Sequence, residues 1–223
     1  MDALPNVADW DEMGHMVAIE PERLRLPPEI QTQSGSYFNF IHPELSEFTI
    51  EDIACALSKL CRFTGHTRVF YSVAQHSRMV SQIVPQQDAL AGLLHDASEA
   101  FLNDINSPLK QLLPQYQAIE KRVEAAIMQR FGLSLPLPAS VKQADLIMLA
   151  TEKRDLLPGC VDSHWEIVRG IDPLSDTINP LDPSCAYFDF LDRFDAITAR
   201  PTYLYVKEPH PAFGGLGQYI DSH

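Results

Sequence analysis

The sequence predicts an all-α domain, a helical bundle of five to six core helices with short peripheral strands near the termini. First, apolar residues recur at helical spacing throughout the middle of the chain. Second, residues typical of helix starts and stops bound these stretches. Third, the two strand-like runs, 37–41 and 203–206, lie near the ends. The chain has 223 residues, of which 45% are apolar, so it is large enough to bury a substantial core.

The first predicted helix begins at Thr49, where Thr49 and Asp52 resemble a capping box. Its apolar residues follow at intervals of three and four up to Leu60. Pro114 suits the first turn of a later helix, and Gly132 suits its C-terminal end. Further helices are predicted over about 69–84, 87–102, 114–132, 139–157 and 183–198.

Three parts are expected along the chain. Residues 1–48 form an irregular N-terminal extension, 49–200 form the helical domain, and 201–223 form a C-terminal tail. The strand-like runs 37–41 and 203–206 are candidates to pair with each other. One globular domain with additions at both ends fits this length.

The charge and the cysteines limit the partners and the location. A formal net charge of −13 argues against binding DNA, RNA or an anionic membrane, but a small phosphorylated substrate stays compatible with a locally positive pocket. No apolar run approaches the roughly 20 residues that span a bilayer, and no signal peptide is expected. The four cysteines form no Cys-x-x-Cys pair, so we expect reduced thiols and a cytoplasmic protein.

A histidine and two carboxylates fall within about one turn of the helix predicted over 87–102. Asp96 and Glu99 are three residues apart and His95 and Glu99 are four apart, so they share a face. Two carboxylates on an otherwise apolar helix repel each other and are costly to desolvate, and a divalent cation removes both costs. Imidazole and carboxylate suit Mn²⁺, Co²⁺, Fe²⁺, Zn²⁺ or Mg²⁺, so the pattern indicates a site for one divalent metal ion.

With His76 and Asp145 in neighbouring predicted helices, the adjacent His95 and Asp96 resemble the motif of the HD-domain superfamily of metal-dependent phosphohydrolases. Within it, the chain is most similar to the 5′-deoxynucleotidase group and its phage-type relatives, which include dATP triphosphohydrolases. The resemblance extends from about residue 48 to about 158. The segments that carry it are 50–54, 61–67, 70–77, 95–99, 104–105 and 107–110.

The resemblance implies a role for each matching residue. The metal ligands would be His76, His95, Asp96 and Asp145. Glu99 would be the general acid/base that positions or deprotonates the attacking water.

Substrate-binding roles are implied around this set. Arg62 would bind phosphate, and Asp104 would lie near the sugar. Phe63 stands where some deoxynucleotidases carry tryptophan, which bears on nucleotide selectivity. His66, in a loop after a glycine, and Lys110 are further candidates for phosphate contacts.

The residues leave several functions open. The leading expectation is an enzyme that releases phosphate from deoxynucleoside monophosphates. The alternatives are a deoxynucleoside triphosphate triphosphohydrolase, a non-catalytic nucleotide-sensing module, and a scaffold whose motif is incidental. By resemblance we also expect a homo-oligomer. Glu152 shares a helix face with Asp145, but the run Glu152-Lys153-Arg154-Asp155 suggests a solvated, salt-bridged patch.

Overall fold

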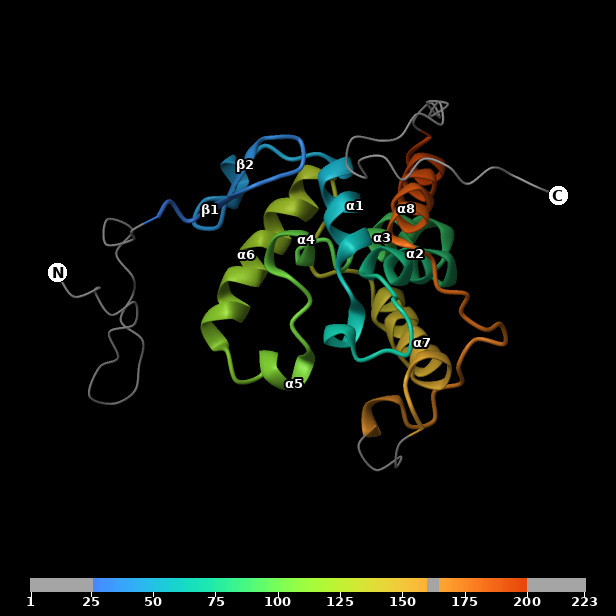
Figure 1. Cartoon of the computed structure of the whole chain (residues 1–223). Coiled ribbons are helices and arrows are strands. Elements are labelled where there is room, and N and C mark those ends of the chain that lie inside the picture. The colour runs from blue at the N-terminus through green and yellow to red at the C-terminus, as the bar shows by residue number, and fades with distance from the viewer. Residues whose placement is uncertain (1–25, 160–164, 200–223) are drawn as a thin grey trace, which may run out of the picture.

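The computed structural model describes residues 26–159 and 165–199, and helices dominate them, as the sequence predicts (Figure 1). The helices are α1 (Ile50–Lys59), α2 (Val73–Ile83), α3 (Ala89–Leu94), α4 (Glu99–Leu102), α5 (Ser107–Lys110), α6 (Pro114–Arg130), α7 (Ala139–Leu156) and α8 (Pro183–Thr198). The all-α fold class is therefore confirmed for this part of the chain. Within it, no helix is both long and apolar enough to cross a membrane.

The capping box predicted at the start of α1 is present. The Thr49 hydroxyl accepts from the backbone N–H of Asp52, and the Asp52 carboxylate accepts from the backbone N–H of Thr49. This reciprocal pair satisfies two N–H groups that the first turn of a helix leaves without partners. The predicted starts of α6, α7 and α8 and their approximate ends also agree with the structure.

Two predicted helices differ from the structure. The helix expected over 69–84 begins only at Val73, because Ser72, whose backbone is extended, is its N-cap. The helix expected over 87–102 is divided into α3 and α4. Between them the backbone tightens: the N–H of Ala97 bonds to Leu94 O at 2.9 Å and that of Glu99 to Asp96 O at 3.0 Å, both three residues back.

A two-stranded antiparallel sheet precedes the helices. Strand β2 (Tyr37–Asn39) pairs with β1 (Glu29–Gln31), and Ile30 lies opposite Phe38. The strand predicted near 37–41 is thus present with a partner upstream, whereas the run 203–206, proposed as its partner, lies outside the described residues. The ring of Phe38 is fully buried, so this hairpin packs on the helical core.

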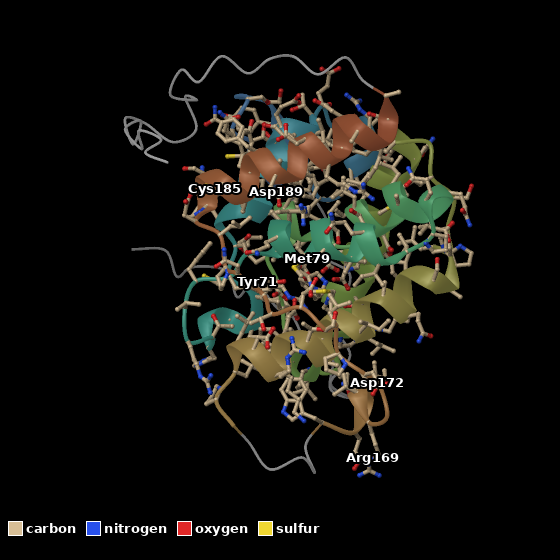
Figure 2. The ribbon with its side chains drawn as sticks, turned by 90° about the vertical axis from the view of Figure 1, so that its right-hand side faces the viewer. Tyr71, Met79, Arg169, Asp172, Cys185 and Asp189 are labelled. Atoms are coloured by element: carbon tan, nitrogen blue, oxygen red, sulfur yellow. The ribbon has the colours of Figure 1, made fainter. Side chains whose placement is uncertain are left out.

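The helices surround two groups of buried apolar side chains. One group lies among α1, α4, α6 and α8 and includes Phe38, Leu57 and Phe190. The other lies among α2, α3 and α7 and includes Val80, Ala91 and Met148. Figure 2 shows α2 lying between α8 on one side and α7 on the other. This central position buries α2 on both faces, so a polar side chain on it needs a buried partner.

Candidate metal centre

His76 lies in the first turn of α2 and is completely buried. The segment that precedes α2 is paired with the end of α1: Arg62 N donates to Tyr71 O, and Val73 N donates to Leu60 O, each at 3.0 Å. These bonds fix the start of α2 beside residues 60–62. They explain how Arg62, which lies before α2, and His76, which lies within it, come to share one site.

His95 ends α3 and faces His76. Its Nδ1 lies 2.9 Å from the carbonyl oxygen of Gly92, to which a protonated Nδ1 donates. Its Nε2 then points at the Nε2 of His76, 3.3 Å away. Nδ1–H bonded to a backbone carbonyl leaves the Nε2 lone pair free, which is how ligating histidines are usually oriented.

Two aspartates complete the cluster. Asp145, on α7, places Oδ1 3.5 Å from Nε2 of His76, and Lys142 donates to its other oxygen at 2.9 Å. Asp96 places Oδ2 3.2 Å from Nε2 of His95 and 3.6 Å from Nε2 of His76. Side chains from α2, from the end of α3 and from α7 therefore converge on one point.

The spacing of these atoms fits a bound cation. Donor atoms of His76, His95 and Asp145 all lie within 4.8 Å of one another. Ligands held roughly 2.1 Å from one ion, at tetrahedral or octahedral angles, are roughly 3.0–3.4 Å apart. The spacings between Nε2 of His76 and its neighbours, 3.3 to 3.6 Å, are close to this range. Three of the four residues predicted as ligands, His76, His95 and Asp145, thus form a group that could hold a metal ion, and Asp96 lies beside them.

The protein environment keeps the aspartates of the cluster ionised. Burial acts to raise the pKa of Asp96, but the imidazole of His95, with His76 and Arg62, holds that pKa well below its usual range. Burial opposes ionisation of Asp145 in the same way, and its bond with His76 outweighs it and lowers the pKa. Ionised carboxylates are the form that binds a cation.

Glu99 differs from these aspartates. It begins α4, is 6% exposed, and has one carboxyl oxygen, Oε2, with no hydrogen-bond partner in the described part of the protein. Burial raises its pKa well above the ordinary value, and the charges of Asp96 and Asp104 raise it further. A buried carboxyl group with an unpartnered oxygen beside the cluster is a candidate to exchange a proton with a bound water.

Arg62 is buried between two carboxylates. One terminal nitrogen donates to Glu152 at 3.0 Å, and the other lies 3.4 Å from Oδ2 of Asp96. Its Nε–H is buried and has no partner in the described residues. The arginine predicted to bind phosphate therefore lies beside the cluster and retains an unused donor.

Glu152 corrects one interpretation of the sequence. We expected a solvated patch, but the side chain is fully buried and bonds to both His76 and Arg62. Arg154 and Asp155 do form the expected ion pair, although the side chain of Asp155 is only 7% exposed. The signal that distinguishes Glu152 is its spacing of seven residues from Asp145, two helical turns along the same face.

The other predicted substrate residues have different surroundings. The ring of Phe63 lies 5.4 Å from the guanidinium of Arg62. Asp104 is half-buried; burial raises its pKa, and the charges of Arg62 and Asp96 also act on it. Lys110 is bonded to Glu120 at 2.6 Å, and His66 is exposed at the end of the turn Arg62–Gly65.

The backbone is strained next to two of these residues. Phe63 and Thr64 have φ of 55° and 54°, and Asn103, just before Asp104, has φ of 66°. A left-handed conformation is unfavourable for Phe63 and above all for the β-branched Thr64. Asn103, with ψ of 160°, lies in another region that is used almost only by glycine. Such strain gathers at functional sites more often than elsewhere in folds.

Comparison with known proteins adds relatives whose functions are not described. The chain is 46% identical over 172 residues to the uncharacterized protein YfdR of Escherichia coli, covering 76% of this chain and 95% of that protein. It is also 36% identical over 121 residues to the uncharacterized protein RCAP_rcc00048 of Rhodobacter capsulatus, covering 50% of this chain and 62% of that protein. No family model matches. The identity and coverage of the first match place the chain in one family with Escherichia coli YfdR.

Proposed function

We propose that this protein is an HD-domain phosphohydrolase that uses one divalent metal ion to release phosphate from deoxynucleoside monophosphates. The observation that carries the proposal is the convergence of His76, His95, Asp96 and Asp145, whose facing atoms lie 3.2–3.6 Å apart. The order of these residues along the chain and the surrounding motifs resemble that superfamily. The proposal includes a cytoplasmic location and a homo-oligomeric state, both on grounds of sequence.

The chain's own residues suit phosphate transfer to water. A divalent ion held at the cluster would supply a water of lowered pKa and positive charge against a phosphoryl oxygen. Glu99, with an unpartnered carboxyl oxygen, accepts a proton from the attacking water. Arg62 offers its unpartnered Nε–H to a phosphate oxygen and stabilises the charge that develops there. Asp104, assigned to the sugar by the resemblance, would accept a hydrogen bond from a sugar hydroxyl.

The pairing of the nearby cations favours a monophosphate over a triphosphate. A triphosphate carries more charge and would need further positive groups around the site. Lys110, a candidate for this role, is bonded to Glu120 and half-buried, and its pKa is raised by that bond against the opposing effect of burial. If Lys110 contacts a triphosphate, it must leave Glu120.

The test is turnover of a nucleotide panel by purified protein. Deoxy- and ribonucleoside mono- and triphosphates are incubated with Mn²⁺, Co²⁺ or Mg²⁺, and separately with EDTA, and products are separated by ion exchange. We expect metal-dependent release of phosphate from deoxynucleoside monophosphates. Turnover of triphosphates alone would establish the alternative enzyme, and nucleotide binding without turnover would favour the sensing module.

Variants separate the roles within the site. Asp145→Asn should lose bound metal and activity, whereas Glu99→Gln should keep metal and lose at least a hundredfold in kcat. Asp192→Asn, on the exposed face of α8, is the matched control and should change neither. Near-normal turnover by Glu99→Gln would show that this carboxylate is not the base.

A further inference from the structure

Glu152 is a fully buried carboxyl group, and each of its two oxygens is bonded to a neighbouring side chain. The exposed fraction of its side chain is 0%. Burial alone raises the pKa of a carboxyl group, yet Arg62 and His76 outweigh burial and lower the pKa of Glu152. A fully buried carboxylate stays ionised only when both of its oxygens have partners. Both oxygens of Glu152 have one.

One carboxylate oxygen of Glu152 bonds to His76 and fixes which ring nitrogen carries the proton. Oε1 lies 2.6 Å from Nδ1 of His76, a distance typical of a charge-assisted hydrogen bond. Because a carboxylate only accepts, the proton of this bond belongs to Nδ1. Nε2 is then the atom available to a metal ion, and it is the atom that faces His95, Asp96 and Asp145.

The other carboxylate oxygen of Glu152 bonds to Arg62. Oε2 accepts from one terminal nitrogen of the guanidinium at 3.0 Å, while the opposite terminal nitrogen faces Asp96 at 3.4 Å. The guanidinium is thus held between a predicted ligand and Glu152. The contacts on its two terminal nitrogens restrict its rotation, and this sets the direction of the Nε–H, which has no partner among the described residues.

Tyr71 is a further buried neighbour of Glu152. Its ring is fully buried, and its hydroxyl donates to the sulfur of Met79 at 3.9 Å (Figure 2). Burial raises the pKa of the Tyr71 hydroxyl, and the charge of Glu152 and a side-chain hydrogen bond with it raise that pKa further. Glu152 therefore has a polar neighbour in Tyr71 as well as His76 and Arg62, and its side chain is away from solvent.

We propose that Glu152 is a positioning residue that orients His76 for the metal ion and Arg62 for phosphate through one shared carboxylate. The inference rests on the proposed function for the role of Arg62, while the role toward His76 requires only that the cluster binds metal. It predicts that metal affinity and phosphate affinity depend on the same side chain, although Glu152 touches neither ligand. Outer partners of this kind commonly change metal affinity by 10- to 100-fold.

The test compares Glu152→Gln with Thr151→Val. Glutamine keeps the volume of the side chain. Its amide nitrogen must face either Nδ1–H of His76 or the guanidinium of Arg62, so two hydrogen-bond donors meet at one of these contacts. Thr151 is the adjacent buried residue on α7, where its hydroxyl bonds to Ile147 O and Leu174 N and to no residue of the cluster. Thr151→Val therefore perturbs α7 without touching the network.

Mn²⁺ binding by calorimetry and denaturant unfolding are measured for both variants. We expect Glu152→Gln to weaken Mn²⁺ binding about 10- to 100-fold, and Thr151→Val to lower stability with Mn²⁺ affinity within about twofold of wild type. In Zn²⁺-loaded protein, the downfield Nδ1 proton of His76 should be seen by NMR in wild type and be lost or shifted in Glu152→Gln. Inorganic phosphate should also bind the metal-loaded variant more weakly.

The outcomes separate this inference from the proposed function. If wild type binds metal but hydrolyses no nucleotide, the function is wrong and the metal affinities still decide the role of Glu152. If Glu152→Gln loses stability as Thr151→Val does, with unchanged Mn²⁺ affinity and His76 signal, the carboxylate is only a buried structural partner. Wild-type protein that binds no divalent ion overturns both.

Discussion

The ring of Phe38 stacks on the ring of Phe101, with centroids 3.8 Å apart and planes inclined by 14°. Phe38 belongs to the hairpin β1–β2, and Phe101 lies on α4, two residues after Glu99. The N-terminal hairpin therefore packs directly against the short helix that carries the proposed base. This contact joins the stability of the hairpin to the placement of Glu99.

Replacing Phe38 by alanine should destabilise the protein by about 3–5 kcal/mol, because a fully buried aromatic side chain leaves a cavity. Urea unfolding followed by circular dichroism measures the change. Tyr37→Ala, on the neighbouring residue that is 56% exposed, should cost less than about 1 kcal/mol. Equal losses in the two variants would show that the hairpin does not pack on the core as described.

Gly65→Ala tests the strained turn that follows Arg62. Gly65 has φ of +79°, and a Cβ added there would meet no atom within 4 Å. The cost, about 1–2 kcal/mol, should then come from conformation alone. Gly159→Ala is the control, since that site is equally open and lacks the positive φ. Thermal unfolding measures the stability of both variants. A Gly65→Ala variant as stable as wild type would contradict the left-handed turn.

Gly92→Ala tests the close approach of α2 and α3. A Cβ at Gly92 would lie 3.1 Å from Cα of Ser81 and 3.1 Å from Cγ2 of Val84, and backbone cannot move aside cheaply. We expect a loss of about 1–3 kcal/mol. Since α2 carries His76 and the end of α3 carries His95, Mn²⁺ affinity should fall as well. Unchanged metal affinity in a destabilised variant would show that the helices separate without moving the ligands.

The metal-free protein should lose stability as pH rises above neutral. Burial and Arg62 act to lower the pKa of His76, but Glu152 and Asp145 outweigh them and raise it to about 9. A raised folded-state pKa stabilises the protein fully below the unfolded value of about 6.5, and this contribution disappears as pH approaches 9. The shift corresponds to roughly 3 kcal/mol at most. Unfolding measured from pH 6 to 9.5 in EDTA tests this.

The same proton competes with metal. Apparent Mn²⁺ affinity should rise with pH, up to about tenfold per unit from pH 7 to 8.5, because binding must displace the proton on Nε2 of His76. Protein saturated with metal should not show the decline in stability of the metal-free form. Metal affinity that is flat over this range would mean that His76 is already neutral in the free protein.

Much of the helical framework is predictable because it is encoded locally. Thr49 with Asp52, Pro114 and Gly132 act within one turn of the helix end that they mark. The errors occur where contacts distant in sequence decide. Helix α2 starts late because residues 60–62 pair with 71–73, and only Ser72, a favourable N-cap, hints at this in the sequence.

The predicted ligands converge because their spacing places them on inward helix faces. The burial of Glu152, in contrast, was not predicted. Its neighbours Lys153, Arg154 and Asp155 are charged, and this suggests a solvated surface. A helix shows only every third or fourth residue to the core, so one buried carboxylate is compatible with charged neighbours. Its partners, Arg62 and His76, are 90 and 76 residues away in sequence, beyond any local pattern.

The tight turn between α3 and α4 restricts how the length of the chain can vary over evolution. Each added residue in a helix rotates all that follows by about 100°. One insertion between Asp96 and Glu99 would therefore turn the proposed base away from the ligands and withdraw Phe101 from Phe38. Homologues that keep this chemistry should show no insertions or deletions here.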